Sequence, residues 1–511
     1  METGRATSRQ IVAEYLVRIG MYEDMLHAAI SVNRRALEEA DERDRDRALG
    51  RVRGPLHGIP IALKDNILTT HLPTTGGALV FDGFIPPYEA TITANLRGAG
   101  AIILAKTGMT ELANWVAVGM PGNYNAIGGF GMNPYDPRRD PRGGSGDGGP
   151  VMSPGGSSSG IGTTANLWAA NVGSETSGSI LTPANATMLA AVKPTVGRIS
   201  RYGMIPITAD QDTAGPMAKS VMDAATMLGV LEGAAPDPHD AATRRCTPPP
   251  GRDYTRLLRA DSLKGARIGL PRASYESRTG AGAARLLTDV IATLIALGAV
   301  IIDPAEIPSV IDPDRNKNFL SWGTCSDAAE RRGRDEDCSV VLKYGMKRDF
   351  NKWLASLGPS APVRTLSELI AWNLAHRDAG AIRYGQALLE ISDEMDVERD
   401  RGRYDRDRAK DIALSGTHGI DEVMNSMQLD ALLFPGSSGA PIAAKAGYPS
   451  VIVPVGFVAP APMSLPPGFE LKPQPFGVTF TGMACSEPRL LAFAYAFEQA
   501  TKKRVTPASA P

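Results

Sequence analysis

The chain has 511 residues, with 54 lysines and arginines against 55 aspartates and glutamates, and its formal net charge is −1. Because the charge is balanced, no positive excess favours binding to nucleic acid or to an anionic membrane. Hydrophobic residues make up 43% of the chain and charged residues 21%, which is typical of globular proteins and excludes general disorder. We therefore expect a folded protein that binds neither nucleic acid nor a membrane.

The four cysteines, Cys246, Cys325, Cys338 and Cys485, lie far apart and contain no Cys-x-x-Cys pair. Zinc sites and disulfide frameworks usually show closer, paired spacings, so we expect neither, and no metal. The N-terminal sequence lacks the basic and then apolar profile of a signal peptide, and no run of about 18 apolar residues occurs. These features predict a reducing, cytoplasmic location.

Two helices are expected to open the chain. Thr7 and Gln10 have the spacing of a capping box, and apolar residues then recur at four-residue steps. A second helix is expected over Glu23–Asp44. The apolar run Ile59–Leu63 has the length of a strand and brings Lys64 to its end.

The next segments alternate between helix and strand. We expect a helix at Thr91–Leu96, a strand at Ala101–Leu104 and a helix at Glu111–Val118. Further strands are expected at Ala266–Leu270, Val300–Asp303, Asp430–Phe434, Ser450–Val455 and Phe476–Phe480, and long helices at Ala283–Leu297 and Pro488–Lys502. This alternation predicts an α/β fold with a central, mostly parallel or mixed twisted sheet that is flanked by helices.

One domain is expected to span residues 1–511. Between Val341 and Met427, helical patterns follow one another without a clear strand, so residues 315–427 are predicted to form a helical cap over the sheet. Residues 505–511 are expected to form a frayed, disordered tail.

Two loops rich in glycine and serine are the densest unusual feature. Ser153–Gly160 and Gly173–Ser179 bracket one short expected helix, Thr163–Ala170. Glycines let backbone N–H groups approach a ligand from the same side, as an anion or oxyanion site requires. A lone cluster of this kind is more often a flexible surface loop, but two so close together favour a site. Neither loop has the ending of a P-loop or the G-x-G-x-x-G pattern in the right context, so nucleotide binding is not expected.

A catalytic serine would need a base. The chain has only six histidines, and no apolar strand leads into Gly156–Gly160, so support for a Ser-His-Asp triad of the α/β-hydrolase type is weak. Lys64 is the alternative, because desolvation at the end of an apolar strand lowers the pKa of a lysine and leaves part of it neutral. A neutral lysine accepts a proton from a serine hydroxyl. From the residues alone, a structural pairing of Lys64 with Asp65 or another acid explains its position equally well.

Four collinear segments carry a family resemblance: Gly54–Ile67, Leu96–Thr107, Pro154–Gly160 and Gly173–Ile180. Gly197–Pro206, Asp212–Met217 and Gly447–Pro454 extend it over nearly the whole chain. On these motifs the chain resembles the amidase signature family, the Ser-Ser-Lys amide hydrolases, and within it the stand-alone members related to peptide amidase. The resemblance implies the amidase signature fold, a small-molecule amide as substrate and no cofactor. We expect a monomer or a homodimer.

The resemblance also implies the roles of individual residues. Ser179 is implied as the nucleophile, Ser157 as the bridging serine on a cis peptide bond and Lys64 as the base. Ser179 would attack the amide carbonyl and give an acyl-enzyme, while its proton passes through Ser157 to Lys64. The oxyanion hole would consist of the backbone N–H groups of Thr176, Ser177, Gly178 and Ser179. An all-trans backbone over Gly156–Ser158 would argue against this relay.

The Gly/Ser loops depart from the family pattern. The interval between Ser157 and Ser179 is slightly shorter than in the family, which leaves Ser158 as an alternative bridging serine. Ser177 stands where glycine or aspartate is frequent, and Leu181 stands where arginine is frequent. Contacts with the substrate are therefore expected to differ.

Two further segments bear on the site. The Gly-rich stretch Arg142–Met152 is additional to the family pattern and is either an inert insertion or part of an active-site rim. Lys106 is a second lysine at the end of an expected strand, and the motif gives it a structural role.

Two other functions stay open at this point. The amidase subunit of a tRNA-dependent amidotransferase needs a partner protein, whereas the end of this chain, Glu487–Lys503, looks more like the stand-alone group. A binding module that kept the fold and lost the activity would have little need of Lys64, Ser157 and Ser179 together. The function that we expect is therefore that of an amidase acting on linear amides other than peptide bonds.

Overall fold

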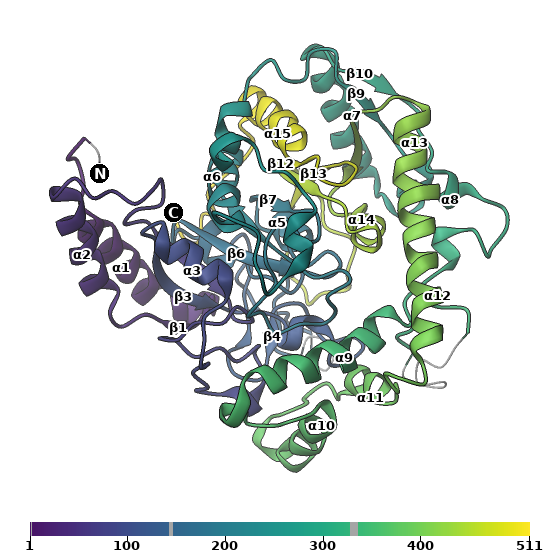
Figure 1. The fold of residues 1–511 in the computed structure, drawn as a ribbon. Coiled ribbons are helices and arrows are strands. Elements are labelled where there is room, and N and C mark those ends of the chain that lie inside the picture. The colour runs from purple at the N-terminus through teal and green to yellow at the C-terminus, as the bar shows by residue number, and fades with distance from the viewer. Residues whose placement is uncertain (2, 143–146, 328–335) are drawn as a thin grey trace.

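The computed structural model describes residues 1, 3–142, 147–327 and 336–511 (Figure 1). In these ranges the strands are β1 (Ala29–Val32), β2 (Pro60–Lys64), β3 (Ile102–Thr107), β4 (Tyr124–Asn125), β5 (Gly129–Phe130), β6 (Ala170–Glu175), β7 (Ala190–Lys193), β8 (Thr213–Ala218), β9 (Arg267–Gly269), β10 (Val300–Ile302), β11 (Ala431–Pro435), β12 (Ser450–Val458) and β13 (Gln474–Thr481). The α-helices are α1 (Ser8–Leu26), α2 (Ala36–Ala48), α3 (Thr91–Gly98), α4 (Ile161–Thr164), α5 (Leu181–Ala186), α6 (Val221–Glu232), α7 (Ala281–Ala296), α8 (Pro308–Ile311), α9 (Val341–Ser356), α10 (Leu366–Ala375), α11 (Ala387–Asp393), α12 (Arg401–Ile412), α13 (Asp421–Ser426), α14 (Ala440–Ala446) and α15 (Glu487–Thr501).

Eleven strands form one mixed sheet in the order β1-β3-β2-β6-β8-β7-β12-β13-β11-β9-β10, and β4 and β5 form a separate hairpin. The neighbours β3, β2 and β6 are parallel, as are β11, β9 and β10, while the pairs from β6 to β11 are antiparallel. Every residue of β2, β3 and β6 is buried, as expected of strands with both faces covered. The predicted single-domain α/β fold with a mixed central sheet is confirmed.

Helices cover both ends of this sheet (Figure 1). α1 and α2 lie beside β1 and β3 at one edge, and α7 lies beside β9 and β10 at the other. The expected capping box is present, because the Thr7 side chain accepts a hydrogen bond from the Gln10 N–H and the Gln10 side chain accepts one from the Thr7 N–H. No helix of the described ranges is long and apolar enough to span a membrane.

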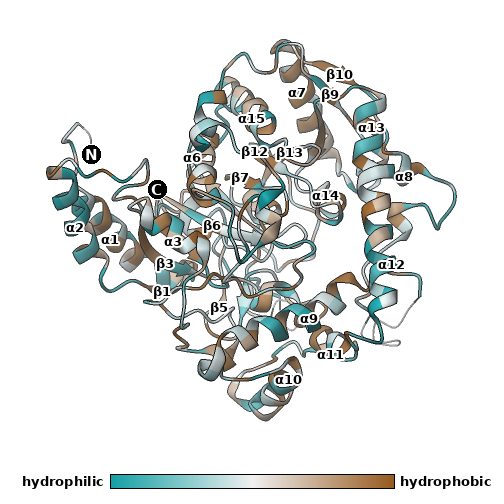
Figure 2. Ribbon diagram, viewed as in Figure 1, coloured by the Kyte–Doolittle hydropathy of each residue, from teal (hydrophilic) through white to brown (hydrophobic). Residues whose placement is uncertain are grey.

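The helical cap is formed by α9–α13, in the region where helical patterns were expected (Figure 1). α12 and α13 are joined by a π-helical segment, Ala413–Ile420, and together form one long rod that contacts α8, α9 and α14 (Figure 1). α12 is strongly hydrophilic (Figure 2). Its buried residues are Tyr404, Asp407 and Asp411, so α12 packs through hydrogen bonds and ion pairs rather than through an apolar stripe.

The expected helix over Glu23–Asp44 is wrong over residues 27–35, while residues 36–44 are confirmed as part of α2. α1 ends at Leu26, and His27 adopts a left-handed conformation with φ 49°. The chain then forms β1, which pairs with β3, before α2 begins at Ala36. Pairing with a distant strand overrides the local helical pattern here.

Two shorter helices were also predicted wrongly. The segment expected at Glu111–Val118 forms only a 3₁₀ turn, because Leu112 and Ala113 have positive φ. The helix expected at Thr163–Ala170 ends at Thr164, and β6 begins at Ala170.

The C-terminal residues 505–511 pack against the body of the protein, so the frayed tail expected there is wrong. Ala510 is fully buried, and its carbonyl accepts a hydrogen bond from Arg18 Nη2 at 3.2 Å. The Ser509 hydroxyl donates to the Pro134 carbonyl. These partners lie far away in the sequence, so no local pattern reveals them.

The cysteines form two disulfides, Cys246–Cys485 and Cys325–Cys338. The fold brings the paired Cα atoms to 5.4 Å and 5.1 Å, although the first pair is 239 residues apart in the sequence. The expectation of no disulfide is therefore wrong, and the reducing location inferred from it loses that support.

Candidate active site

Lys64 is the last residue of β2, between β3 and β6 in the sheet. Its side chain is fully buried, and Nζ donates hydrogen bonds to the Ser157 hydroxyl at 2.7 Å and to the Ser174 carbonyl at 3.1 Å. Burial lowers the pKa of Lys64 to about 7, although Asp212 and Glu175 oppose the shift by favouring the charged form. Near neutral pH a substantial fraction of Lys64 is therefore a neutral amine that can accept a proton.

Lys106 has a different environment near the end of β3, the neighbouring strand. Its Nζ lies 3.1 Å from Asp65 Oδ1 in a fully buried ion pair and donates a hydrogen bond to the Thr74 hydroxyl at 2.7 Å. The structural pairing with Asp65 that the sequence allowed for Lys64 thus belongs to Lys106. This arrangement agrees with the structural role that the motif implies for Lys106.

Ser157, rather than Ser158, contacts Lys64. The Ser158 hydroxyl donates to the Ser174 carbonyl at 2.8 Å and accepts from the Ser174 N–H at 3.1 Å. It is therefore occupied by the backbone of β6, while the Ser157 hydroxyl lies against the lysine amine. The geometry favours Ser157 as the bridging serine and gives Ser158 a supporting role.

The peptide bonds on either side of Ser157 are trans. Among the described residues the one cis bond is Asp303–Pro304, so the cis bond expected at Ser157 is wrong. A trans bond avoids the cost of about 3 kcal/mol that a cis non-proline bond carries. The family resemblance implied a cis bond at Ser157, and the trans backbone argues against the proton relay. The support for the relay is the observed hydrogen bond between Ser157 and Lys64.

The glycines of the Ser157 loop allow it to lie close to α5. Gly155 has φ +96°, a conformation that favours glycine, and a Cβ there would lie 2.4 Å from the Pro183 Cα. A Cβ on Gly156 would lie 3.5 Å from the Ser179 Cα. The Ser158 N–H also donates to the Ser179 carbonyl at 3.0 Å. The two Gly/Ser loops therefore contact each other and place Ser157 near Ser179.

The Ser179 loop provides free hydrogen-bond donors. In the described structure no partner accepts a hydrogen bond from the backbone N–H groups of Thr176, Ser177, Gly178 and Ser179. Gly178 has φ +84°, which turns the chain tightly before α5 begins. Free N–H groups on a tight loop are the components of an oxyanion hole.

Two carboxylates hold this loop in place. Glu175 Oε2 accepts hydrogen bonds from the N–H groups of Ile180 at 2.7 Å and Leu181 at 3.0 Å, which fixes the start of α5. Asp212 accepts one from the Thr176 hydroxyl at the other end of the loop. Burial raises the pKa of Asp212 to about 7.

Several of these supporting residues were missed from the sequence. Asn123 donates a hydrogen bond from Nδ2 to the Gly156 carbonyl at 2.6 Å, and no sequence pattern indicated it. Glu175 and Asp212 both lie within motifs that carried the family resemblance, but the sequence analysis assigned neither residue a role.

The stretch Arg142–Met152 reaches the cap. Residues 143–146 lie outside the described residues. Asp147 accepts a hydrogen bond from the Tyr384 hydroxyl, and the Tyr384 ring packs edge-on against Tyr124 at 4.9 Å between ring centroids. Tyr124 follows Asn123, which donates a hydrogen bond to the Gly156 carbonyl. These contacts therefore favour Arg142–Met152 as part of the active-site rim over an inert insertion.

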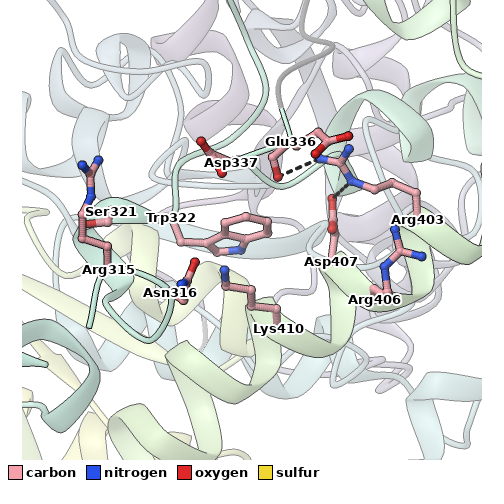
Figure 3. Close-up of a pocket in the computed structure, with 10 residues that line it drawn as sticks. All are labelled: Arg315, Asn316, Ser321, Trp322, Glu336, Asp337, Arg403, Arg406, Asp407 and Lys410. Carbon is pink, nitrogen blue, oxygen red and sulfur yellow. Dashed lines mark hydrogen bonds and ion pairs between the residues drawn. The ribbon is translucent and has the colours of Figure 1, made fainter. Parts of the chain in front are cut away.

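A separate cavity lies beside α12 and has a volume of about 670 Å³ (Figure 3). The described residues that line it are Arg315, Asn316, Ser321, Trp322, Glu336, Asp337, Arg403, Arg406, Asp407 and Lys410. Lys410 Nζ lies 3.8 Å from the centre of the Trp322 ring. None of the three expected catalytic residues lines this cavity, so it is distinct from the candidate active site.

Within the described ranges, no group of three or more His, Cys, Asp or Glu side chains is arranged to hold a metal ion.

Comparison with known proteins supplies the family. The amidase family model matches residues 10–491, and the chain belongs to the amidase family. A probable amidase from Arabidopsis thaliana is 33% identical over 509 residues, which cover 98% of this chain and 88% of that protein. A glutamyl-tRNA(Gln) amidotransferase subunit from Thermosynechococcus vestitus is 31% identical over 516 residues, 97% of this chain and 95% of that protein. The X-ray structure of native peptide amidase from Stenotrophomonas maltophilia is 35% identical with a TM-score of 0.81, covering 99% of this chain and 96% of that one.

These matches confirm the predicted family and fold. They also support amide hydrolysis as the chemistry of this chain, and with it the general class of hydrolases that act on amides. The matches do not assign the roles of individual residues or the substrate.

Proposed function

We propose that this chain is a stand-alone amidase that cleaves a linear carboxylic amide, other than a peptide bond, to an acid and an amine or ammonia. The reaction proceeds through an acyl-enzyme on Ser179, with Ser157 and Lys64 as the proton relay. The observation that carries the proposal is the 2.7 Å hydrogen bond between Lys64 Nζ and Ser157 Oγ in a chain of the amidase family. The contact between the two Gly/Ser loops supports it.

Acylation uses the neutral form of Lys64. The lysine amine takes the proton of the Ser157 hydroxyl, Ser157 takes that of Ser179, and the Ser179 oxygen forms a bond to the amide carbon. The carbonyl oxygen becomes an oxyanion that accepts hydrogen bonds from the free N–H groups of Thr176–Ser179, where the loss of one donor typically costs about 3 kcal/mol. The C–N bond then breaks, and the proton held by Lys64 returns through Ser157 to the departing amine.

Deacylation uses the same groups with water in place of the serine. Water attacks the ester carbon while its proton passes through Ser157 to Lys64, and the same oxyanion hole receives the negative charge. When the C–O bond to Ser179 breaks, the proton returns to the serine oxygen. The products are the free acid and the original enzyme.

Competition between water and hydroxylamine tests the acyl-enzyme. Two amides with the same acyl group and different leaving amines should give the same ratio of acid to hydroxamate, because both pass through one intermediate. Ser179→Ala should form neither product. A ratio that changes with the leaving amine would contradict a common acyl-enzyme.

A second candidate is the amidase subunit of a tRNA-dependent amidotransferase, which the 31% identity to the glutamyl-tRNA(Gln) amidotransferase subunit from Thermosynechococcus vestitus favours. Glutamine hydrolysis that depends on a co-purifying partner protein would support it. Our proposal requires amide hydrolysis by the isolated chain, as a monomer or homodimer, with no nucleic acid or membrane partner. Light scattering on the purified, active protein measures the oligomeric state.

The cytoplasmic location expected from the sequence remains a prediction. The disulfides Cys246–Cys485 and Cys325–Cys338 argue against it, because disulfides persist mainly in oxidising compartments. Fractionation of the native host's cells, with this protein detected by mass spectrometry, tests the location directly.

A further inference from the structure

Four consecutive residues, Ala209–Asp212, lie between the helical cap and the loop that carries Ser179. We call them the bridging segment. They precede β8 and belong to no helix or strand. Their side chains and backbone divide into two groups: the last two residues hold Thr176, and the first two hold the cap.

The catalytic side of the bridging segment makes two contacts with one residue. Asp212 accepts a hydrogen bond from the Thr176 hydroxyl, and Gln211 Nε2 donates one to the Thr176 carbonyl at 3.1 Å. Thr176, Gln211 and Asp212 are 7%, 1% and 7% exposed, so water competes little for these bonds. The second oxygen of Asp212 accepts from the N–H groups of Ile207 and Thr208, which fixes the carboxylate.

Thr176 is fixed at its side chain and at its carbonyl, while its backbone N–H has no partner among the described residues. This N–H is the first of the proposed oxyanion donors. The Thr176 carbonyl shares its peptide plane with the Ser177 N–H, which likewise has no acceptor in the described ranges, so the Gln211 contact sets the direction of the Ser177 donor. The Asp212 contact holds the Thr176 side chain. Glu175 holds the other end of the loop independently, through Ile180 and Leu181.

The cap side of the bridging segment makes ion pairs and hydrogen bonds with α9 and α12. The Ala209 N–H donates to Asp349 at 2.7 Å. Asp210 accepts from Arg348 Nη2 at 3.0 Å and from the Tyr404 hydroxyl at 2.8 Å. The cap is therefore linked to Thr176 through two adjacent pairs of residues.

We propose that Gln211 and Asp212 are positioning residues that orient the Thr176 end of the oxyanion hole, and that Asp210 links this orientation to the cap. The inference rests on the proposed function. It adds that the cap takes part in catalysis through the geometry of the nucleophile loop. A segment that served only to hold the fold together would affect stability and leave the chemical step unchanged.

The rate of covalent labelling by a fluorophosphonate measures this geometry without a natural substrate. In the labelling step the Ser179 oxygen bonds to phosphorus, fluoride leaves, and the hydroxyl proton passes through Ser157 to Lys64. The phosphoryl oxygen gains charge in the oxyanion hole. Concentration series separate the rate constant of this step, kinact, from the binding constant KI.

Thr176→Val and Thr176→Ser form the matched pair. Valine has the shape of threonine without the hydroxyl, whereas serine keeps the hydroxyl that donates to Asp212. We expect kinact to fall about 10-fold to 100-fold in Thr176→Val with KI little changed, because misplacing a donor by about 1 Å has effects of this size. Thr176→Ser should stay within about threefold of the unmodified protein.

Asp210→Asn tests the link to the cap, and Asp393→Asn is its control. Asp393 forms an ion pair with Lys347 within the cap and makes no contact with the bridging segment. We expect kinact to fall about threefold to tenfold in Asp210→Asn and to remain unchanged in Asp393→Asn. Equal rates in these two variants would overturn the link to the cap.

Equal kinact for Thr176→Val and Thr176→Ser, at equal folded fraction by circular dichroism, would overturn the role of Asp212. If Thr176→Val does not fold, Gln211→Met tests the other contact: it removes the amide that holds the Thr176 carbonyl, kinact should fall about 10-fold, and an unchanged kinact would overturn the role of Gln211. An unmodified protein that is folded but not labelled on Ser179 would overturn the proposed function and this inference with it. Normal labelling that none of the variants slows would overturn this inference alone.

Discussion

Lys64 and Lys106 lie at the ends of adjacent parallel strands and are both fully buried, yet only Lys106 has a carboxylate within ion-pair distance among the described residues. Lys64 Nζ contacts the Ser157 hydroxyl at 2.7 Å, whereas Lys106 Nζ lies 3.1 Å from Asp65. The register pairs Lys106 with Leu63, the residue before Lys64, so the two lysine side chains leave opposite faces of the sheet: one lysine can lose its proton, and the charge of the other is paired. The difference separates a catalytic from a structural role.

Lys64→Met and Lys106→Met should fail in opposite ways. Lys64→Met should lower kcat by several orders of magnitude and leave the protein folded, because methionine fills the space without a base. Lys106→Met should destabilise the fold by about 3–5 kcal/mol, because it leaves the Asp65 carboxylate buried without its partner. Amide hydrolysis and urea unfolding of both variants check this. An active Lys64→Met protein would contradict the relay.

Activity should fall on the acid side with an apparent pKa near the value of about 7 for Lys64. The neutral amine is the active form, so below this pH kcat/KM should drop roughly tenfold per pH unit. A rate that is independent of pH between about 5 and 9 would exclude a titrating base.

Asp212→Asn should move this acid limb to lower pH. The charge of Asp212 favours protonated Lys64, as does that of Glu175, so removing one negative charge lowers the pKa of the lysine. Because burial raises the pKa of Asp212 itself to about 7, the limb of the unmodified protein belongs to the coupled pair. The pH dependence of kcat/KM in both proteins measures the shift, and a shift to higher pH would contradict the assignment.

Ser157→Ala and Ser158→Ala distinguish the two neighbouring serines. Ser157→Ala should lower kcat by orders of magnitude with little change in stability, because it interrupts the path between Ser179 and Lys64. Ser158→Ala should retain most of the activity and lose about 1–3 kcal/mol of stability, because the N–H and carbonyl of Ser174 lose a buried partner. Turnover and thermal unfolding are the measurements. The reverse pattern would make Ser158 the bridging serine.

All four cysteines should be oxidised in the native protein. Peptide mapping without reductant should recover Cys246–Cys485 and Cys325–Cys338, and a thiol assay under denaturing conditions should detect no free thiol. In the chain-entropy model, closing a loop of 239 residues contributes about 5 kcal/mol and one of 13 residues about 3 kcal/mol. Cys246→Ser should therefore lower the unfolding temperature more than Cys338→Ser, and free thiols in the native protein would contradict the pairing.

The sequence predicted the strands and helices that follow clear local periodicity, and failed where distant partners decide the structure. Ile59–Leu63 and Pro488–Lys502 were placed within a residue or so of β2 and α15. By contrast, β1 exists because it pairs with β3, and residues 505–511 are ordered against segments far away in the sequence. Local patterns contain no information about such pairing.

The site shows the same division. Lys64 and Ser157 were expected in contact because motifs identified them, and they are. The cis peptide bond was expected on the same grounds and is absent at Ser157. Asn123 and Gln211 act through single hydrogen bonds that depend on the folded chain, so no sequence spacing could have indicated them.

Mapping the site of a covalent label tests the central claim most directly. The folded protein is treated with a fluorophosphonate, digested and analysed by peptide mass spectrometry, beside Ser179→Ala and Lys64→Met. Our account predicts one adduct on Ser179, none in Ser179→Ala, and much slower labelling in Lys64→Met. An adduct on Ser157 or Ser158, or no adduct on the folded protein, would contradict it.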